Sequence, residues 1–196
     1  MTRLFLILFA AVGLIACGKA PQSQYANQVV KSETRYDDLN IRDHTQAPMQ
    51  VDIALQLDMS AERALDIALD FENLKDWVKP TPKVDAIVDN SDTADGEFGV
   101  GTVVTYKEGE SDEIVAYKPG AYAIAKPLWK TDVLLDHRGV VLVKSDGNGG
   151  AIVHFRRYFE AKGFEGWMMS KMMPMFMKNS AKNLIKIHGG EILHKR

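Results

Sequence analysis

Residues 163–190 read GFEGWMMSKMMPMFMKNSAKNLIKIHGG, and this stretch decides the fold because it is the longest segment with helical periodicity. Six apolar side chains recur at helical spacing and fall in one broad arc: Met169, Met172, Met173, Phe176, Leu184 and Ile187. The pair Gly189 and Gly190 ends the pattern, as glycines commonly end helices. We therefore predict a long C-terminal helix whose apolar face packs against the elements before it.

The first half of this helix is rich in methionine. Methionine is unbranched and polarizable, so it fills irregular space and adapts to varied apolar partners. Two interpretations of the methionine face remain open, namely ordinary core packing and the wall of a ligand cavity. Pro174 lies within the pattern and lacks a backbone donor, so the helix is either kinked at Pro174 or begins there.

The opposite side of the same helix carries four lysines: Lys171, Lys178, Lys182 and Lys186. A solvated helix face explains such a stripe in most proteins. Contact with anionic lipid headgroups is the second interpretation.

The residues before the helix predict strands joined by short turns. The stretch MQVDIALQLD, residues 49–58, alternates apolar and polar side chains and predicts a half-buried strand. Ser60 can cap a helix that begins at Ala61, and a second short helical turn covers residues 74–78. Six further β-rich runs follow between residues 83 and 161, and strands joined this closely pair as antiparallel hairpins.

This order of elements predicts an α+β architecture. A curved antiparallel sheet of about seven strands wraps around the long C-terminal helix, and two short helices follow the first strand. Space between a curved sheet and a helix is a natural place for an apolar ligand.

Several local stretches resemble the START-like, or SRPBCC, superfamily of polyketide cyclases, plant pathogenesis-related proteins and lipid-transfer domains. They are the opening strand with SAERALDIALDF, Trp77, GVGTVV, EIVAYKPGAY, GNGGAIVHFRRYF and NLIKIHGGE, within residues 49–192. The resemblance implies the helix-grip fold of that superfamily and a cavity for lipids, sterols, polyketides or similar molecules. It does not imply catalysis, since many members of the superfamily only bind.

The strand AIVHFRRYFEA, residues 151–161, divides into two faces because side chains alternate along a strand. We expect Phe155 and Arg157 to face the interior, where Arg157 needs a carboxylate, a ligand oxygen or water. His154 would then face outward and be inert.

The candidate ligand-binding residues combine these patterns with the implied cavity. They are Trp77, Tyr106, Tyr122, Phe155, Arg157, Met169, Met172, Met173 and Phe176. The expected ligand is a hydrophobic small molecule or lipid, which the protein binds and either transfers or presents. The five histidines lack metal-ligand spacing, so we expect no metal, no cofactor and no catalytic set.

Two other functions remain open. A cyclase- or hydratase-type enzyme would need a polar cluster inside the cavity, for which Arg157, Tyr106, Tyr122 and Asp132 are the candidates. A ligand-free interaction module would show an exposed apolar patch and no cavity.

The N-terminus predicts export and anchoring. Residues 4–14 form an apolar run that is about half as long as a membrane span, which is typical of a signal peptide. Residues 14–17, LIAC, resemble the lipobox of bacterial lipoproteins, which implies that Cys17 is acylated after removal of residues 1–16. The resemblance implies a lipid-anchored protein of the cell envelope, with the periplasmic side of the outer membrane favoured.

The remaining domain limits follow from composition. Residues 17–48 are polar with few periodic apolar positions and predict a tether, although apolar residues such as Leu39 and Ile41 can dock on the domain. Residues 49–192 form the START-like domain and residues 193–196 a short tail. The chain has 24 basic and 26 acidic side chains, a balance that gives no sign of nucleic-acid binding.

Overall fold

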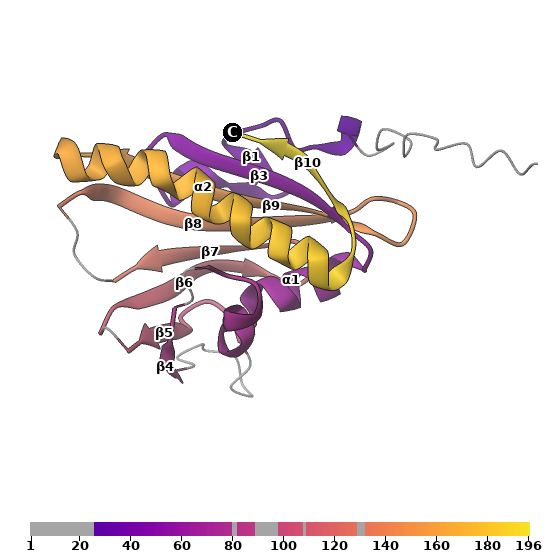
Figure 1. Ribbon diagram of the computed structural model, residues 1–196, viewed down its shortest axis with the longest axis horizontal. Helices are drawn as coiled ribbons and strands as arrows, with labels where there is room; N and C mark the ends of the chain where they lie inside the picture. The colour runs from indigo at the N-terminus through magenta and orange to yellow at the C-terminus, as the bar shows by residue number, and fades with distance from the viewer. Residues whose placement is uncertain (1–25, 80–81, 89–97, 108, 129–131) are drawn as a thin grey trace, which may run out of the picture.

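A computed structural model describes residues 26–79, 82–88, 98–107, 109–128 and 132–196 (Figure 1). The main domain runs through β3 (Met49–Leu57), α1 (Ala61–Leu69), the 3-10 helix η3 (Phe71–Asp76), β4 (Val84–Val88), β5 (Val103–Tyr106), β6 (Ser111–Lys118), β7 (Tyr122–Pro127), β8 (Leu134–Ser145), β9 (Ala151–Ala161), α2 (Gly163–His188) and β10 (Glu191–Lys195). Four short elements precede it: η1 (Ala26–Gln28), β1 (Arg35–Tyr36), β2 (Leu39–Asn40) and η2 (Ile41–Asp43).

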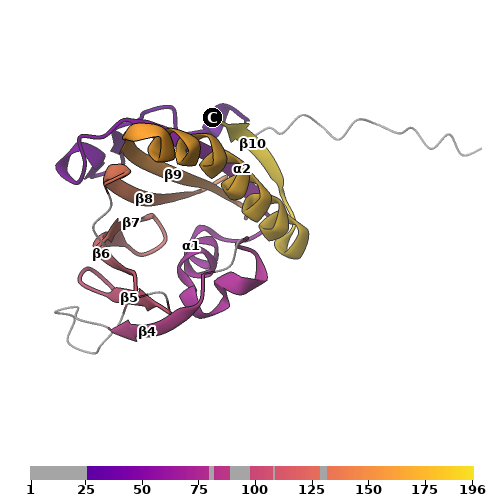
Figure 2. The same cartoon turned by 60° about the vertical axis from the view of Figure 1, so that its left-hand side comes forward.

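The domain is built on one antiparallel sheet of eight strands in the order β10-β3-β9-β8-β7-β6-β5-β4. The strands from β4 to β9 pair in chain order, each antiparallel to the next. The sheet curls from β9 round to β4, with α1 inside the bend and α2 across β3 and β9 (Figure 2). The predicted α+β architecture is confirmed.

The eighth strand is β10, which we expected to be partly a tail. Gly189 and Gly190 have φ angles of 79° and 114°, and these values turn the chain back along β3. At Gly190 a Cβ would overlap the carbonyl oxygen of Gln56, so only glycine allows this close return. Residues 193–195 therefore belong to an edge strand of the sheet.

The main core lies on the concave face of the sheet. Ser60 caps α1 by accepting a hydrogen bond from the backbone nitrogen of Arg63, and Leu65 of α1 is fully buried. Leu55 of β3, Val153 of β9 and Leu184 of α2 pack in the same cluster.

Helix α2 is continuous through Pro174, so the prediction of a helix that begins at Pro174 is wrong. Its buried apolar side chains, Ala181 and Leu184, lie in its second half. Before this buried part, Met169, Met172 and Phe176 are only half-buried. A proline costs less at this place than in a buried helix, because the carbonyl that it leaves unpaired can bond water. Among the described residues no helix has the length and apolar content needed to cross a membrane.

The convex face of the sheet is covered by residues 28–48, which we call the strap. Ile41 of the strap is fully buried, and Leu39 and Ala47 are nearly so. They pack with Leu142 of β8 and Tyr158 of β9 in a second apolar cluster. The part of the predicted tether that the structure describes is therefore packed on the domain, and the docking alternative is the one observed there.

Hydrogen bonds to the strap backbone anchor it to β9. Nε2 of His154 accepts from the backbone nitrogen of Val30 at 3.0 Å, and Arg156 donates to the carbonyl oxygens of Val30 and Ser32. The hydroxyl of Tyr158 donates to the carbonyl of Glu33 at 2.7 Å. His154 faces away from the concave core as predicted, but it is fully buried and bonded, so the prediction that it is inert is wrong.

A buried carboxylate completes this arrangement. Asp52 of β3 lies 2.8 Å from Nδ1 of His154 and 3.2 Å from Nη2 of Arg156. Burial alone would raise the pKa of Asp52, but the hydrogen bond from His154 and the charge of Arg156 outweigh it and lower that pKa. Burial lowers the pKa of His154 despite the nearby carboxylate, so the ring is neutral and can accept from Val30.

Acidification is expected to destabilise this face. The folded pKa of His154 lies below its ordinary value of 6.5, so the unfolded chain takes up the proton first as the pH falls below that value. The free energy of unfolding should then fall by up to about 1.4 kcal/mol per pH unit for each such histidine. Urea unfolding between about pH 7 and pH 5 measures this slope.

The variant His154→Gln should have a shallower slope than wild type. The protection of the Val30 amide, measured relative to its intrinsic exchange rate, should fall as the pH approaches the lowered pKa of His154, since protonated His154 cannot accept its hydrogen bond. Equal slopes in wild type and His154→Gln would contradict this account.

Candidate ligand cavity

Two adjoining hollows lie between the concave face of the sheet and the helices. One of about 170 Å³ extends over β5 to β9 beneath η3, and one of about 250 Å³ lies between β9 and α2. The walls that they share contain Trp77, Val78, Phe155, Arg157 and Met177. We refer to both together as the cavity.

The floor of the first hollow is made of small residues. Ala123 and Ala125 of β7 and Gly139 of β8 face the concave side, where larger side chains would fill the space. The large side chains of these two strands lie on the convex face instead, where Ile124 and Leu142 are buried in the second cluster. The alternation of small and large residues along these two strands therefore leaves the hollow open.

Aromatic side chains form the junction of the two hollows. Trp77, at the end of η3, is 8% exposed and lies against Phe155 of β9 with ring centroids 5.6 Å apart. Asn183 of α2 donates to the carbonyl of Trp77 at 3.1 Å, which ties η3 to the C-terminal helix. The wall is thus held by elements from both ends of the domain.

Arg157 lies on the cavity floor. A Cβ at Gly139 would overlap Nη1 of Arg157 and would lie 3.1 Å from Cζ, so the guanidinium rests directly on the backbone of β8. Only a glycine leaves room for this position. The cation is therefore directed across the sheet toward β6 and β5, and it is half-buried.

Tyr106 and Asp112 form the polar part of the opposite wall. The hydroxyl of Tyr106 donates to Oδ2 of Asp112 at 3.0 Å. Burial raises the pKa of Asp112, and the charge of Arg157 opposes this rise only in part. Burial and the charge of Asp112 raise the pKa of Tyr106, so its hydroxyl is a neutral donor.

His137 is a half-buried neutral side chain beside this cluster, with both ring nitrogens inaccessible to solvent. Its ring packs edge-on against Phe159 with centroids 5.8 Å apart. Burial, followed by the charges of Arg157 and Arg138, lowers the pKa of His137 to about 3. Neither ring nitrogen has a hydrogen-bond partner among the described residues. Within the same residues no group of three or more metal-binding side chains is arranged around a common point.

Six of the nine sequence-predicted ligand residues line the cavity: Trp77, Tyr106, Phe155, Arg157, Met173 and Phe176. Met169 and Met172 are half-buried on α2 but line neither hollow. Asp132, a candidate only for the enzyme hypothesis, is exposed and also lines neither hollow. Whether any of these residues contacts a ligand stays a prediction.

Tyr122 lies on the wrong face for the predicted role. It packs against the second cluster, beneath the strap, because Ala123 and Ala125 take the concave positions of β7. The sequence reasoning missed Asp112 and the small residues of the floor. Alternation in residues 122–125, with alanine at every second position, was the available signal for the floor.

Comparisons with known proteins agree with this geometry. No protein-family model matches the chain, and no curated protein matches it in sequence. Among solved structures, a START superfamily protein from Mycobacterium smegmatis is 15% identical, with a TM-score of 0.52 over 72% of this chain and 97% of that protein. An HSP90 activator from Plasmodium falciparum is 13% identical, with a TM-score of 0.52 over 74% of this chain and 97% of that protein.

A third similar structure is the protein XoxI from Bacillus cereus, which is 12% identical, with a TM-score of 0.50 over 70% of this chain and 93% of that protein. Likeness at such low identity describes the backbone arrangement and carries no information on ligand or activity. Together with the curled sheet and its C-terminal helix, these matches show that the chain has the START-like helix-grip fold.

Proposed function

We propose that the protein binds a hydrophobic small molecule or lipid in the cavity between the sheet and the helices. The observation that carries the proposal is the floor of Ala123, Ala125 and Gly139, which keeps an apolar hollow open beside the Trp77–Phe155 junction. The fold supports it as well, because proteins of this fold commonly bind hydrophobic ligands.

The size of the hollows favours a modest apolar group. An apolar cavity of about 150 Å³ in a protein core can hold a benzene molecule. Each hollow is larger than this, at about 170 Å³ and 250 Å³. A single ring or a short acyl chain therefore fits one hollow, and a longer chain needs both.

We further propose that acylated Cys17 holds the protein on a membrane of the cell envelope, on the periplasmic side of the outer membrane. The support is the LIAC sequence after an apolar run, and residues 1–25 lie outside those that the structure describes. An anchored cavity would transfer a lipid between membranes or present it to another protein.

A cyclase- or hydratase-type enzyme is the second candidate function. The observation that favours it is the convergence of Arg157, Tyr106 and Asp112 on one hollow. The described residues of the cavity contain no paired nucleophile and base, so binding remains the stronger proposal. Turnover of a bound ligand, followed by mass spectrometry, would separate the two functions.

Filling the floor should abolish ligand binding. Ala125→Leu adds about three carbon atoms to the hollow. Because the hollow has room for them, the substitution should lower the stability by about 1 kcal/mol or less. We expect native mass spectrometry to detect a co-purifying ligand in wild type and in the surface control Ala86→Leu, but not in Ala125→Leu. A wild-type protein with no ligand, and no thermal shift with octanol or octanoate, would reject the cavity function.

Substitution of Cys17 should prevent acylation. Intact-mass analysis of protein extracted from membranes should show a chain that starts at Cys17 and carries fatty acyl groups. Cys17→Ala should incorporate no labelled fatty acid, whereas Ser23→Ala, near the same end, should behave as wild type. A wild-type chain without acyl groups would overturn the anchor and leave the cavity proposal unaffected.

A further inference from the structure

Arg157 is a cation without a counter-charge at bonding distance. Among the described residues its side chain forms no hydrogen bond and no ion pair, although those of four other arginines, Arg42, Arg138, Arg156 and Arg196, make such contacts. Its side chain lines both hollows, and Gly139 supports it from below. The head group is thus held at the junction of the two apolar spaces.

The acidic side chain that lines the first hollow with Arg157 is already engaged. Asp112 faces the first hollow, but it accepts the hydroxyl of Tyr106 and forms no ion pair with Arg157. Neutral His137 brings no negative charge to the same region. A half-buried guanidinium in apolar surroundings is costly unless an anion or water neutralises it.

We propose that the ligand of this cavity is an amphiphile whose anionic group, a carboxylate or a phosphate, pairs with Arg157. The inference rests on the proposed function, because it names the chemical class of the ligand in that same cavity. The apolar part of the ligand occupies the space beside Trp77 and Phe155. A guanidinium suits this role since its planar fork binds two oxygens of such a group at once.

Matched eight-carbon probes test the proposal: octanoate, octyl phosphate and 1-octanol. Wild-type protein should bind the better of the two anions about tenfold to a hundredfold more tightly than the alcohol, measured by calorimetry. The preferred anion identifies whether a carboxylate or a phosphate is the natural group. Arg157→Met should remove the preference while octanol still binds with nearly unchanged affinity.

Lys79→Met is the matched control, because it removes an exposed cation from the rim of the same cavity. It should leave the preference intact. Arg157→Lys keeps the positive charge but lacks the planar guanidinium group, so it should retain part of the preference for the anion. The wild-type comparison needs no variant, so it tests the inference even where Arg157→Met does not fold.

The outcomes separate this inference from the proposed function. Octanol that binds as tightly as both anions in wild type would overturn the anionic ligand and keep the hydrophobic cavity. Binding of none of the three probes would overturn both.

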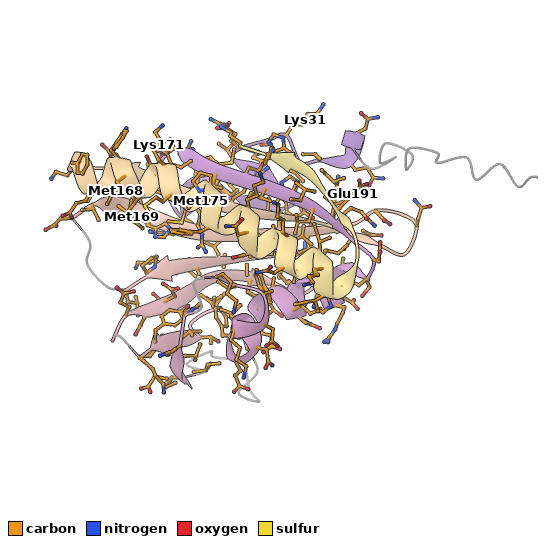
Figure 3. All side chains as sticks on the ribbon, in the orientation of Figure 1. Lys31, Met168, Met169, Lys171, Met175 and Glu191 are labelled. Atoms are coloured by element: carbon orange, nitrogen blue, oxygen red, sulfur yellow. The ribbon has the colours of Figure 1, made fainter. Side chains whose placement is uncertain are left out.

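A second inference comes from the outward side of α2. Phe164 and Trp167 are 73% and 55% exposed, and their rings stack with centroids 5.8 Å apart. Met168 and Met175 continue the same side, at 40% and 51% exposed, and Lys171 lies between them (Figure 3). These five positions follow helical spacing, so they form one stripe, which we call the α2 stripe.

Positive charge continues this stripe toward the C-terminus. Lys178 and Lys182 follow on α2, and the charges of Lys195 on β10 and of Lys182 lower the pKa of Lys178. None of these lysines forms an ion pair with a described residue, and α2 contains a single acidic residue, Glu165. The surface thus joins exposed aromatic rings to a crowded group of cations.

We propose that the α2 stripe and these lysines contact a membrane surface that carries anionic lipids. Aromatic side chains favour the interface between headgroups and acyl chains, and each lysine near an anionic surface adds to the attraction. An anionic membrane is favoured over a second copy of the chain, because a second copy would place the same lysines at the contact and the like charges would repel each other.

Methionine oxidation by peroxide reports this contact in the protein as it exists. Vesicles of phosphatidylcholine with phosphatidylglycerol should slow oxidation of Met168 and Met175 several-fold, read by mass spectrometry. Met59, half-buried beside α1, should be unchanged. Lys178→Ser with Lys182→Ser should weaken the contact about thirtyfold, whereas the exposed pair Lys75→Ser with Lys83→Ser should not.

Three results would overturn the membrane contact. They are an unchanged oxidation rate with vesicles, equal protection by vesicles of phosphatidylcholine alone, and protection that appears without vesicles as the protein concentration rises. The last result would identify a contact between copies.

Discussion

Strand β9 is buried on both of its faces, and the rest of the structure depends on how each face is covered. On the concave side Val153 and Phe155 meet α2 and η3. On the convex side His154 and Tyr158 are fully buried beneath the strap. An antiparallel strand often has one face in solvent, so a two-sided burial requires an additional layer. The strap is that layer, and it leaves the concave face free to be specialised.

Specialisation of the concave face rests on unequal side-chain volume. The side nearest α2 and η3 has aromatic and methionine side chains, while β7 and β8 contribute Ala123, Ala125 and Gly139. Because the sheet is curled, the large side chains cannot reach the small ones, and a hollow remains. The same glycine makes room for the guanidinium of Arg157. One choice of small residues therefore creates both the apolar space and its charged floor.

The sequence predicted those features that depend on periodicity. Alternation along residues 151–161 placed Phe155 and Arg157 on the concave face, and the helical pattern after residue 163 identified α2. The sequence-based prediction failed where the strap buries the convex face of the sheet, because a large apolar side chain on a strand can then point away from the cavity and still be in a core. Tyr122 faces the strap, because a polar segment of the chain turned the convex face into a core. Asp112 could not be found, since its nearness to Arg157 depends on how far the sheet curls between β9 and β6.

The contacts that hold the strap determine which of its positions can change during evolution. The groups that bind His154, Arg156 and Tyr158 are the amide of Val30 and the carbonyls of residues 30, 32 and 33. Main-chain groups are the same whichever side chains accompany them. Related chains can therefore exchange most exposed strap residues through evolution, while His154, Arg156 and Asp52 beneath them tolerate little change. Within the strap itself, the positions that should resist substitution are the few apolar ones buried against the sheet, such as Leu39, Ile41 and Ala47.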